Sequence, residues 1–426
     1  MSNLRYENRG MDDKKTKVTI AVPFQQHSFR AAKGLIRHGM LCSYYTSVYN
    51  DGKGIYSILK YVLPKDLVIR MQGRNDAEIT PYVSKFSQMF GLLYLAACRS
   101  SVLKRYTRTI RSVLFKRFGK SAAQNCISNG TEFVLAYDTQ AYDLFLNLKK
   151  QHSGIVRILD MASTSALTIR EIVDGELKKG YPFSDSLKRH DVEYSEEKCN
   201  QYLEEMKLAD YFLVPSTFVR NSLVKVGIEE RRIIDLPHGV DVEMFTPSVK
   251  KYDTQKTLKF LFVGRVEAAK GIYYILEAFR KLQDLNVELI VVGDMMGQEE
   301  ALKVYTRNVN FLGLKRRDEM PQYYNEADIF VLSSLWEGSS LSMLEAMASG
   351  LPVIASKYSC APDILTGHEG FVIEPRNIEE IENYIRWYYA HREMIPEMSK
   401  AARKLAEKYT WHQYGENLCE IINELA

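Results

Sequence analysis

The chain repeats one pattern along most of its length, a short apolar run followed by a longer helical or polar stretch. Short apolar runs are typical of buried strands, and the stretches between them are long enough to cross over a sheet. In the first half of the chain, these runs lie at residues 17–23, 133–137, 156–160, 211–214 and 233–236. The pattern predicts an α/β fold in which parallel strands alternate with helices.

A second series of runs begins after a polar segment. Residues 246–256 (TPSVKKYDTQK) lack periodicity and contain a proline, which is typical of an interdomain linker. The later runs lie at residues 258–263, 287–292, 309–312, 329–332, 352–355 and 370–373. Because a chain of 426 residues is longer than one that folds around a single hydrophobic core of ordinary size, we expect two domains. The simplest architecture is two Rossmann-like domains that face each other across a cleft.

Composition excludes several classes of protein. The hydrophobic fraction of 46% and the charged fraction of 26% are those of a soluble globular chain. The six cysteines form no CxxC pair, which argues against a zinc site or a disulfide framework and fits a reducing compartment. The first 17 residues lack the apolar region of a secretory signal, and the run Met89–Cys98 is too short to span a bilayer. We therefore expect a cytoplasmic protein whose membrane contact, if any, is peripheral.

Two cations follow the first strand of the second series. That strand leads directly into residues 264–271 (GRVEAAKG). Ligands of open α/β sheets bind beyond the carboxyl ends of strands, where Arg265 and Lys270 are expected to lie. A guanidinium and an ammonium together can neutralise a diphosphate, including one that departs as a leaving group. Taken alone, the pattern fits a solvated loop with incidental charges equally well.

A second polar segment, residues 337–352 (EGSSLSMLEAMASGLP), follows the run at 329–332 and begins a predicted helix. The backbone N–H groups and the dipole at a helix N-terminus favour anions, and small residues there allow a phosphate or sugar to approach closely. We expect the start of this helix to contact the ligand through Gly338, Ser339, Ser340 and Leu341.

The same segment carries two glutamates. Glu337 can accept hydrogen bonds from sugar hydroxyls, and Glu345, about two helical turns later, can accept a pair from a ribose. An alternative exists for Glu345, because Ser342 and Glu345 match the S-x-x-E pattern of a capping box.

These segments together resemble the retaining glycosyltransferases of family 4. Glu337 and Glu345 look like the E-x7-E element of that family, and residues 264–271 resemble its diphosphate-binding loop. The similarity continues through residues 237–241 with Phe245 and Pro247, 309–313, 323–328, 345–353 and 409–411. It covers roughly residues 237–426 and is specific in combination.

The resemblance implies a GT-B fold. An acceptor domain would comprise residues 1–248 together with a returning C-terminal helix at 409–426, and a donor domain would comprise residues 256–408. The implied activity is a hexosyltransferase that uses a UDP- or GDP-linked sugar as substrate and retains the anomeric configuration. It would need no cofactor and no metal, and the sequence offers no Asp-x-Asp, HxxxH or HxH cluster at the relevant places.

The resemblance also assigns roles to residues. Arg265, Lys270 and Glu337 are the expected catalytic residues. The expected donor-binding residues are Gly264, Arg265, Lys270, Leu312, Glu337, Gly338, Ser339, Ser340, Leu341 and Glu345.

The N-terminal half departs from the pattern of the family. The first run is followed by FQQHS, where relatives carry a glycine pair, and the run at 156–160 ends at Asp160, where relatives often place a histidine. His27 or Asp160 can therefore line the acceptor side of the cleft. The alternatives are a hydrogen-bonded loop histidine and a helix-capping aspartate.

Residues 86–120 form a basic amphipathic stretch. Its eight cations interleave with apolar residues, and the stretch contains no acid. One interpretation is an ordinary pair of helices with a solvated face. The other is docking on an anionic membrane surface that carries a lipid-linked saccharide acceptor. A nucleic-acid partner is not expected, because no RNP-like aromatic pattern or zinc-finger spacing accompanies the charge.

Other functions remain open on the sequence. A sugar-nucleotide epimerase can use the same fold and donor, but it needs acids or bases at the sugar and no clear set is present. A catalytically silent sugar-nucleotide-binding scaffold is the alternative outside enzymology. A dinucleotide-dependent dehydrogenase lacks its G-x-G-x-x-G. We expect a glycosyltransferase of glycolipid, cell-surface or capsular polysaccharide synthesis.

Overall fold

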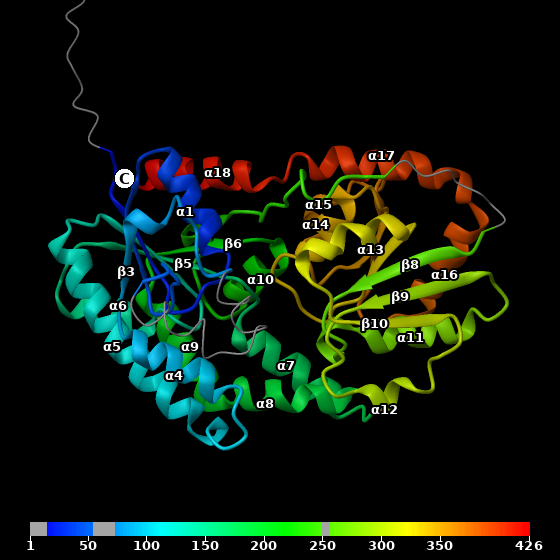
Figure 1. Cartoon of the computed structure of the whole chain (residues 1–426), viewed down its shortest axis with the longest axis horizontal. Coiled ribbons are helices and arrows are strands. Elements are labelled where there is room, and N and C mark those ends of the chain that lie inside the picture. Colours follow the sequence, from blue (N-terminus) through cyan, green and yellow to red (C-terminus); the bar gives the residue numbers. More distant parts are fainter. Residues whose placement is uncertain (1–14, 54–72, 249–255) are drawn as a thin grey trace, which may run out of the picture.

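The computed structural model describes residues 15–53, 73–248 and 256–426, which form two parallel sheets (Figure 1). The leader before residue 15 and most of the predicted linker, residues 249–255, lie outside the described residues. The first sheet has the order β3-β2-β1-β4-β5-β6-β7 and the second the order β10-β9-β8-β11-β12-β13. All of the strand pairs described are parallel, which confirms two Rossmann-like domains.

All of the apolar runs form strands. In the first sheet the strands are β1 (Val18–Ala21), β2 (Leu41–Thr46), β3 (Val83–Lys85), β4 (Phe133–Tyr137), β5 (Val156–Asp160), β6 (Tyr211–Val214) and β7 (Ile233–Asp235). In the second they are β8 (Leu258–Val263), β9 (Val287–Val292), β10 (Val309–Gly313), β11 (Ile329–Leu332), β12 (Val353–Ser356) and β13 (Gly370–Ile373).

Sequence reasoning missed β2 and β3. The sequence of β2, LCSYYT, mixes hydroxyl and aromatic side chains, and β3 contains only VSK. Neither is the continuous apolar run by which the other strands were recognised, and pairing with a neighbouring strand decides their conformation.

Helices cover both faces of the sheets. Those of the first half are α1 (Ser28–Arg37), α4 (Gln88–Ala97), α5 (Thr107–Ser128), α6 (Tyr142–Lys150), α7 (Ala166–Leu177), α8 (Lys188–Glu193), α9 (Glu196–Leu208) and α10 (Thr217–Lys225). The second half contributes α11 (Ile272–Lys281), α12 (Glu299–Leu302), α13 (Met320–Glu326), α14 (Leu341–Ala348), α15 (Ala361–Ile364), α16 (Ile378–Ala390), α17 (Ile395–Ala406) and α18 (Trp411–Leu425).

The last helix, α18, returns to the first domain (Figure 1), as predicted. Thr410 begins it, with a side chain that accepts the backbone N–H of Gln413. The helix packs closely on α1, because a Cβ atom at Gly34 would lie 2.6 Å from the Cα atom of Gly415. Its apolar face, which includes Leu418 and Ile422, joins the core of the first domain.

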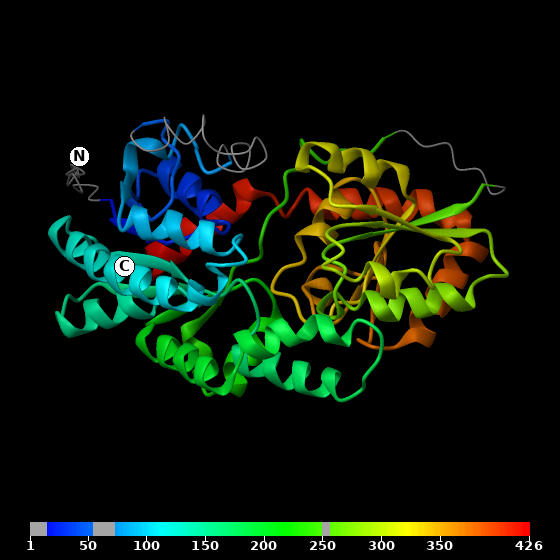
Figure 2. The same cartoon turned by 60° about the horizontal axis from the view of Figure 1, so that its bottom comes forward.

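The two domains also share a hydrophobic core. Ile169 and Val173 of α7, with Phe183 and Leu187 of the segment that follows, pack in the same hydrophobic cluster as the second sheet. Figure 2 shows this part of the first half (green) extending under the second domain. The first half therefore supplies one wall of the space between the domains.

Candidate functional site

The two predicted donor segments meet because their strands are neighbours. Strand β8 pairs with β11, so the loops after them lie side by side. Lys270, in the loop after β8, forms an ion pair with Glu337, in the loop after β11. Ser334 also donates a hydrogen bond to Glu337, with 2.9 Å between the Oγ and Oε1 atoms.

The turn that carries Lys270 requires glycine. Gly271 has a φ of +66°, and a Cβ atom there would lie 1.9 Å from the carbonyl oxygen of Ser333. The backbone after Lys270 thus approaches the end of β11 directly, and this approach brings the ammonium to Glu337.

The start of α14 contacts the first domain. A Cβ atom at Gly338 would lie 2.0 Å from the carbonyl oxygen of Ala162, and the carbonyl of Gly338 accepts a hydrogen bond of 2.9 Å from the Ser216 Oγ atom. Ser340 is the N-cap residue of α14, but its side chain caps no N–H group. Within the described part of the chain, the buried Ser340 Oγ atom has no hydrogen-bond partner.

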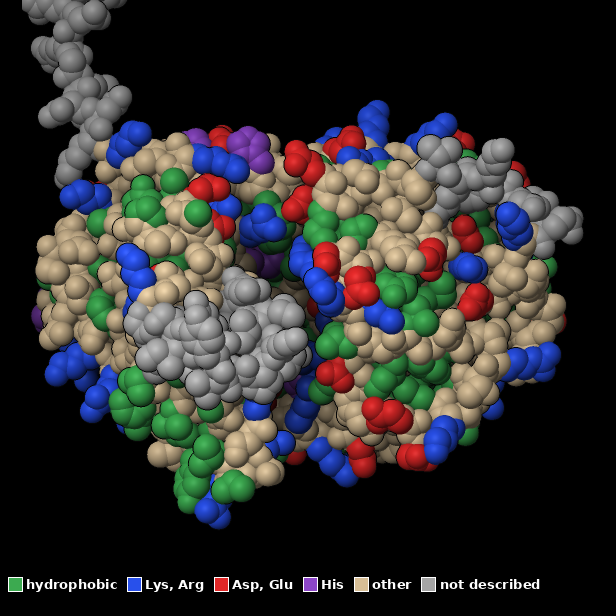
Figure 3. All heavy atoms as spheres, viewed as in Figure 1, with side chains coloured by type: hydrophobic (Ala, Val, Ile, Leu, Met, Phe, Trp, Pro, Cys, Tyr) green, Lys and Arg blue, Asp and Glu red, His purple; other side chains and the backbone are tan. Residues whose placement is uncertain are grey.

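A cavity of about 370 Å³ lies between the two domains, beside the loops that follow β8 and β11. Figure 3 shows the hollow between the two halves, with lysine and arginine side chains along it. The second domain lines the cavity with Arg265, Lys270, Glu337 and Gly338, together with Glu267, Ala269 and Trp336. The first domain contributes Ala162, Ser163, Arg189, His190, Glu193 and Tyr194.

Glu267 is a buried carboxylate in the lining of this cavity. It forms ion pairs with Arg189 and with Arg265, whose Nε atom lies 3.0 Å from its Oε1 atom. The Nε2 atom of His190 lies 3.3 Å from its other oxygen. Burial alone would raise the pKa of Glu267, but His190, Arg265 and Arg189 outweigh it and lower the pKa.

The sequence did not reveal this part of the site. Glu267 lies inside the predicted loop at residues 264–271, and its position between two cations is the one feature of the sequence that points to a role in the site. Arg189 and His190 belong to the short helix α8 of the other domain, where no motif surrounds them. Their place in the cavity depends on how the domains pack.

Glu345 lies in α14 but does not complete a capping box, because Ser340 is the N-cap residue and Ser342 lies inside the helix. Its Oε2 atom accepts a hydrogen bond of 2.9 Å from the Tyr324 hydroxyl, and its Oε1 atom lies 3.1 Å from Arg317. Burial raises the pKa of Glu345.

The predicted donor residues therefore fall into two groups. Arg265, Lys270, Glu337 and Gly338 line the cavity together. The remaining ones, which are Gly264, Leu312, Ser339, Ser340, Leu341 and Glu345, are not among its lining residues. Leu312 belongs to the edge strand β10, which β9 and β8 separate from β11.

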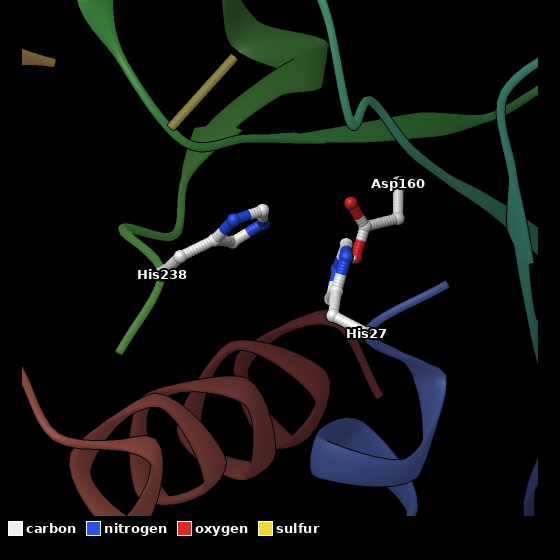
Figure 4. Close-up of side chains that lie close together, drawn as sticks. All are labelled: His27, Asp160 and His238. Atoms are coloured by element: carbon white, nitrogen blue, oxygen red, sulfur yellow. Dashed lines mark hydrogen bonds and ion pairs between the residues drawn. The ribbon is translucent and has the colours of Figure 1, made fainter. Parts of the chain in front are cut away.

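His27 and Asp160 meet in the first domain, outside the 370 Å³ cavity (Figure 4). The Nε2 atom of His27 lies 2.8 Å from the Oδ2 atom of Asp160, which also accepts a hydrogen bond from the Tyr414 hydroxyl. His27 is thus a hydrogen-bonded loop histidine, and Asp160 ends strand β5 without capping a helix.

His238 completes a cluster with these two residues (Figure 4). One ligand atom from each lies within 4.8 Å of the others, a donor set of two imidazoles and one carboxylate. No sequence spacing indicated this cluster, because its members come from three distant segments. Burial and the neighbouring His27 lower the pKa of His238, which favours a neutral ring.

The fold defines the class of protein. The described architecture is a GT-B fold, and solved structures of that kind match almost the whole chain. Sucrose-phosphate synthase from Thermosynechococcus elongatus has a TM-score of 0.69 and 15% identity over 97% of this chain and 99% of its own. Anabaena Alr3699/HepE in complex with UDP has a TM-score of 0.62 and 13% identity, over 96% and 100%.

Sequence comparisons match part of the chain to glycosyltransferases. The family model described as "Glycosyl transferases group 1" matches residues 246–405. Sulfoquinovosyl transferase SQD2 of Arabidopsis thaliana is 32% identical over 48% of this chain and 42% of its own length. An Escherichia coli enzyme named UDP-Gal:alpha-D-GlcNAc-diphosphoundecaprenol alpha-1,3-galactosyltransferase is 30% identical over 37% and 45%. The matches span about half of these relatives, so the likeness covers only part of each chain.

Proposed function

We propose that this protein is a hexosyltransferase that moves a sugar from a UDP- or GDP-linked donor to an acceptor hydroxyl with retention of configuration. The observation that carries the proposal is the interdomain cavity, which unites Arg265, Lys270, Glu337 and Gly338. A cavity with two cations at the carboxyl ends of neighbouring strands suits a sugar nucleotide, whose negative charge is concentrated on its diphosphate.

The cations would stabilise the departing nucleotide diphosphate. Arg265 and Lys270 each pair with a carboxylate, Glu267 and Glu337 respectively. A bound diphosphate would compete with these carboxylates for the cations, and an exchange of partner at Lys270 would free Glu337 for the hydroxyls of the donor sugar. Cations already held in place cost little reorganisation when charge develops on the leaving group. The reaction would then need no essential metal and no cofactor.

The nucleoside would lie toward α14. Glu345 is held by Tyr324 and Arg317, and its carboxylate would accept hydrogen bonds from the ribose hydroxyls. A side chain fixed by two partners presents a defined acceptor, which favours a bidentate contact. The N-terminus of α14 would direct its free backbone N–H groups at the phosphates.

The names of the relatives indicate the biological setting. They include a sulfoquinovosyl transferase, a galactosyltransferase acting on a diphosphoundecaprenol-linked sugar and a Salmonella typhimurium lipopolysaccharide 1,2-N-acetylglucosaminetransferase. One structural neighbour was solved with UDP. These names support a role in glycolipid or polysaccharide synthesis, and the proposal places that role on the cytoplasmic side of a membrane.

The α4–α5 tip, which we define as residues 89–106, is the proposed membrane contact. Met89 and Val102 of this tip are 67% and 66% exposed to solvent, and Leu93 and Tyr106 are exposed as well. Figure 3 shows hydrophobic and basic side chains gathered at the lower edge of the first domain. Exposed apolar side chains among cations suit an anionic lipid surface. No described helix is long and apolar enough to cross a membrane.

A panel of nucleotide sugars tests the function. The donor should raise the melting temperature of the protein, because ligands stabilise the state that binds them. Incubation with that donor and a membrane extract should yield a glycosylated product. Conversion of the donor into its epimer would indicate an epimerase, and binding without any turnover would indicate a scaffold. Either result would contradict the proposal.

A further inference from the structure

A second cavity lies in the first domain, beside the one between the domains. It has a volume of about 620 Å³ and runs between α5 on one side and α8 and α9 on the other. We call it the α5 groove. Glu193, the last residue of α8, lines both the α5 groove and the interdomain cavity, so the two spaces meet at this side chain.

Cations outnumber acids along the α5 groove. Arg108, Arg111, Lys116 and Lys198 line it, against Asp143, Glu193 and Glu197. Within the described part of the chain, Arg108 and Lys116 have neither a hydrogen bond nor an ion pair, and both are exposed. Burial and the nearby Arg111 lower the pKa of Lys198, which reflects a site where positive charges lie close together.

One wall of the α5 groove is firmly held. The buried carboxylate of Glu205 accepts the backbone N–H groups of Thr139, Ala141 and Tyr142 at 2.6 to 2.8 Å. Arg111 in turn donates to the carbonyl oxygen of Thr139 at 3.2 Å. The loop after β4 is therefore preformed, and its contacts also fix the position of one cation.

The groove connects the proposed membrane contact with the proposed site of reaction. The α4–α5 tip contributes Tyr94 to the lining of the groove, and the lining continues with Thr107 and Arg108, directly after the end of the tip. From there it extends to Glu193, where the interdomain cavity begins. A molecule held by its lipid at the tip would lie along the cations before it reached the donor.

We propose that the α5 groove holds the phosphoryl or diphosphoryl group of a lipid-linked acceptor and directs the acceptor saccharide past Glu193 toward the donor sugar. The inference rests on the proposed transferase function and names the chemistry of its acceptor. Arg108 and Lys116, which are exposed and form no ion pair among the described residues, would bind the phosphate oxygens, with Arg111 held nearby. The saccharide end would follow the aromatic side chains of the groove, among them Tyr142 and Tyr202.

The experiment is calorimetric titration with farnesyl diphosphate while excess UDP occupies the donor site. Farnesyl diphosphate should bind. Farnesol, which lacks the phosphate, and glucose 1-phosphate, which lacks the lipid, should each bind at least about tenfold more weakly. Equal binding of farnesol would remove the phosphate from the proposal. Glucose 1-phosphate binding as tightly as farnesyl diphosphate would point to a soluble sugar phosphate and overturn the lipid-linked acceptor.

Paired variants locate the binding. Arg108→Gln with Lys116→Gln should weaken farnesyl diphosphate about tenfold or more and leave the affinity for UDP unchanged. The matched control, Lys207→Gln with Arg231→Gln, removes the same charge from a different basic cavity and should change neither. Unaltered farnesyl diphosphate binding in the first variant would refute the site. Binding in the groove by a protein that transfers no sugar would instead contradict the proposed function alone.

Discussion

Glu176 of the first domain accepts a hydrogen bond of 2.7 Å from the hydroxyl of Tyr274 of the second domain, and both side chains are buried. Tyr181 and Lys179 donate to the same carboxylate from the first domain, and Arg376 does so from the second. Burial alone would raise the pKa of Glu176, but these four donors hold it at about 2. Glu176 therefore joins α7 to the second domain at one wall of the interdomain space.

This contact should make the free energy of unfolding depend on pH in the acidic range. The folded pKa of about 2 lies below the ordinary value of 4.5, so the stabilisation is present above pH 4.5 and is lost as the pH falls through about 2. Glu176→Gln should lower the free energy of unfolding at pH 7 by about 1–3 kcal/mol. Denaturant titrations should show the difference between the two proteins narrowing below pH 4.5. The exposed Glu424→Gln is the control and should have no effect.

Arg265→Ala and Lys270→Ala should each lower turnover by about a hundredfold or more, because each removes charge that would stabilise the leaving diphosphate. The measurement is kcat at saturating donor, with circular dichroism to verify the fold. Lys303→Ala, at the exposed residue that follows α12, serves as the control. Near-normal turnover in either variant would rule out its role at the diphosphate.

Glu345→Gln should weaken nucleotide affinity about tenfold with a small change in melting temperature, because the charged acceptor of the ribose is lost while the helix keeps its shape. Calorimetric titration with UDP and GDP measures the affinity. Tyr324→Phe is a useful companion, because it removes one hydrogen bond to Glu345 but leaves the carboxylate in place. A large loss of stability in Glu345→Gln with unchanged affinity would indicate a structural role instead.

Gly338→Ala should lower activity by obstructing the contact between the domains, since its Cβ atom would meet the Ala162 carbonyl oxygen at 2.0 Å. The carbonyl is backbone and cannot move aside without shifting the loop. Gly175→Ala is the matched control: no atom lies within 4 Å of its Cβ position, and alanine in a helix should stabilise by about 0.5–1 kcal/mol. Steady-state kinetics and melting temperatures of both variants test the contrast. Full activity in Gly338→Ala would show that this close approach is not needed.

The α4–α5 tip should bind anionic vesicles in a manner that salt screens, because each basic side chain near such a surface contributes about 1 kcal/mol. Sedimentation with neutral and anionic vesicles at low and high salt measures this binding. Replacing Arg99, Lys104 and Arg105 by Gln should abolish the preference for anionic lipid while sparing the lining of the α5 groove. Equal sedimentation with both kinds of vesicle would leave the tip as a solvated surface.

The sequence by itself determined most strands and the two donor loops, because both depend on local signals. An apolar run such as residues 258–263 must be buried whatever surrounds it, and a glycine such as Gly271 marks a turn that few other residues can form. The ion pair between Lys270 and Glu337 follows from these signals once β8 and β11 are adjacent. Short strands without a continuous apolar run, such as β3, leave no comparable signal.

Only the tertiary structure decided which distant side chains meet. Arg189 and His190 reach the donor loops from another domain, and His27 meets Asp160 across 133 residues of sequence. Glu176 and Arg376 are 200 residues apart. Such contacts arise from the packing of helices and sheets that have already formed, and residues that belong to different elements carry no common periodicity or motif. The donor loops could therefore be located in the sequence, whereas the wall that the first domain brings to them depends on how the two domains close.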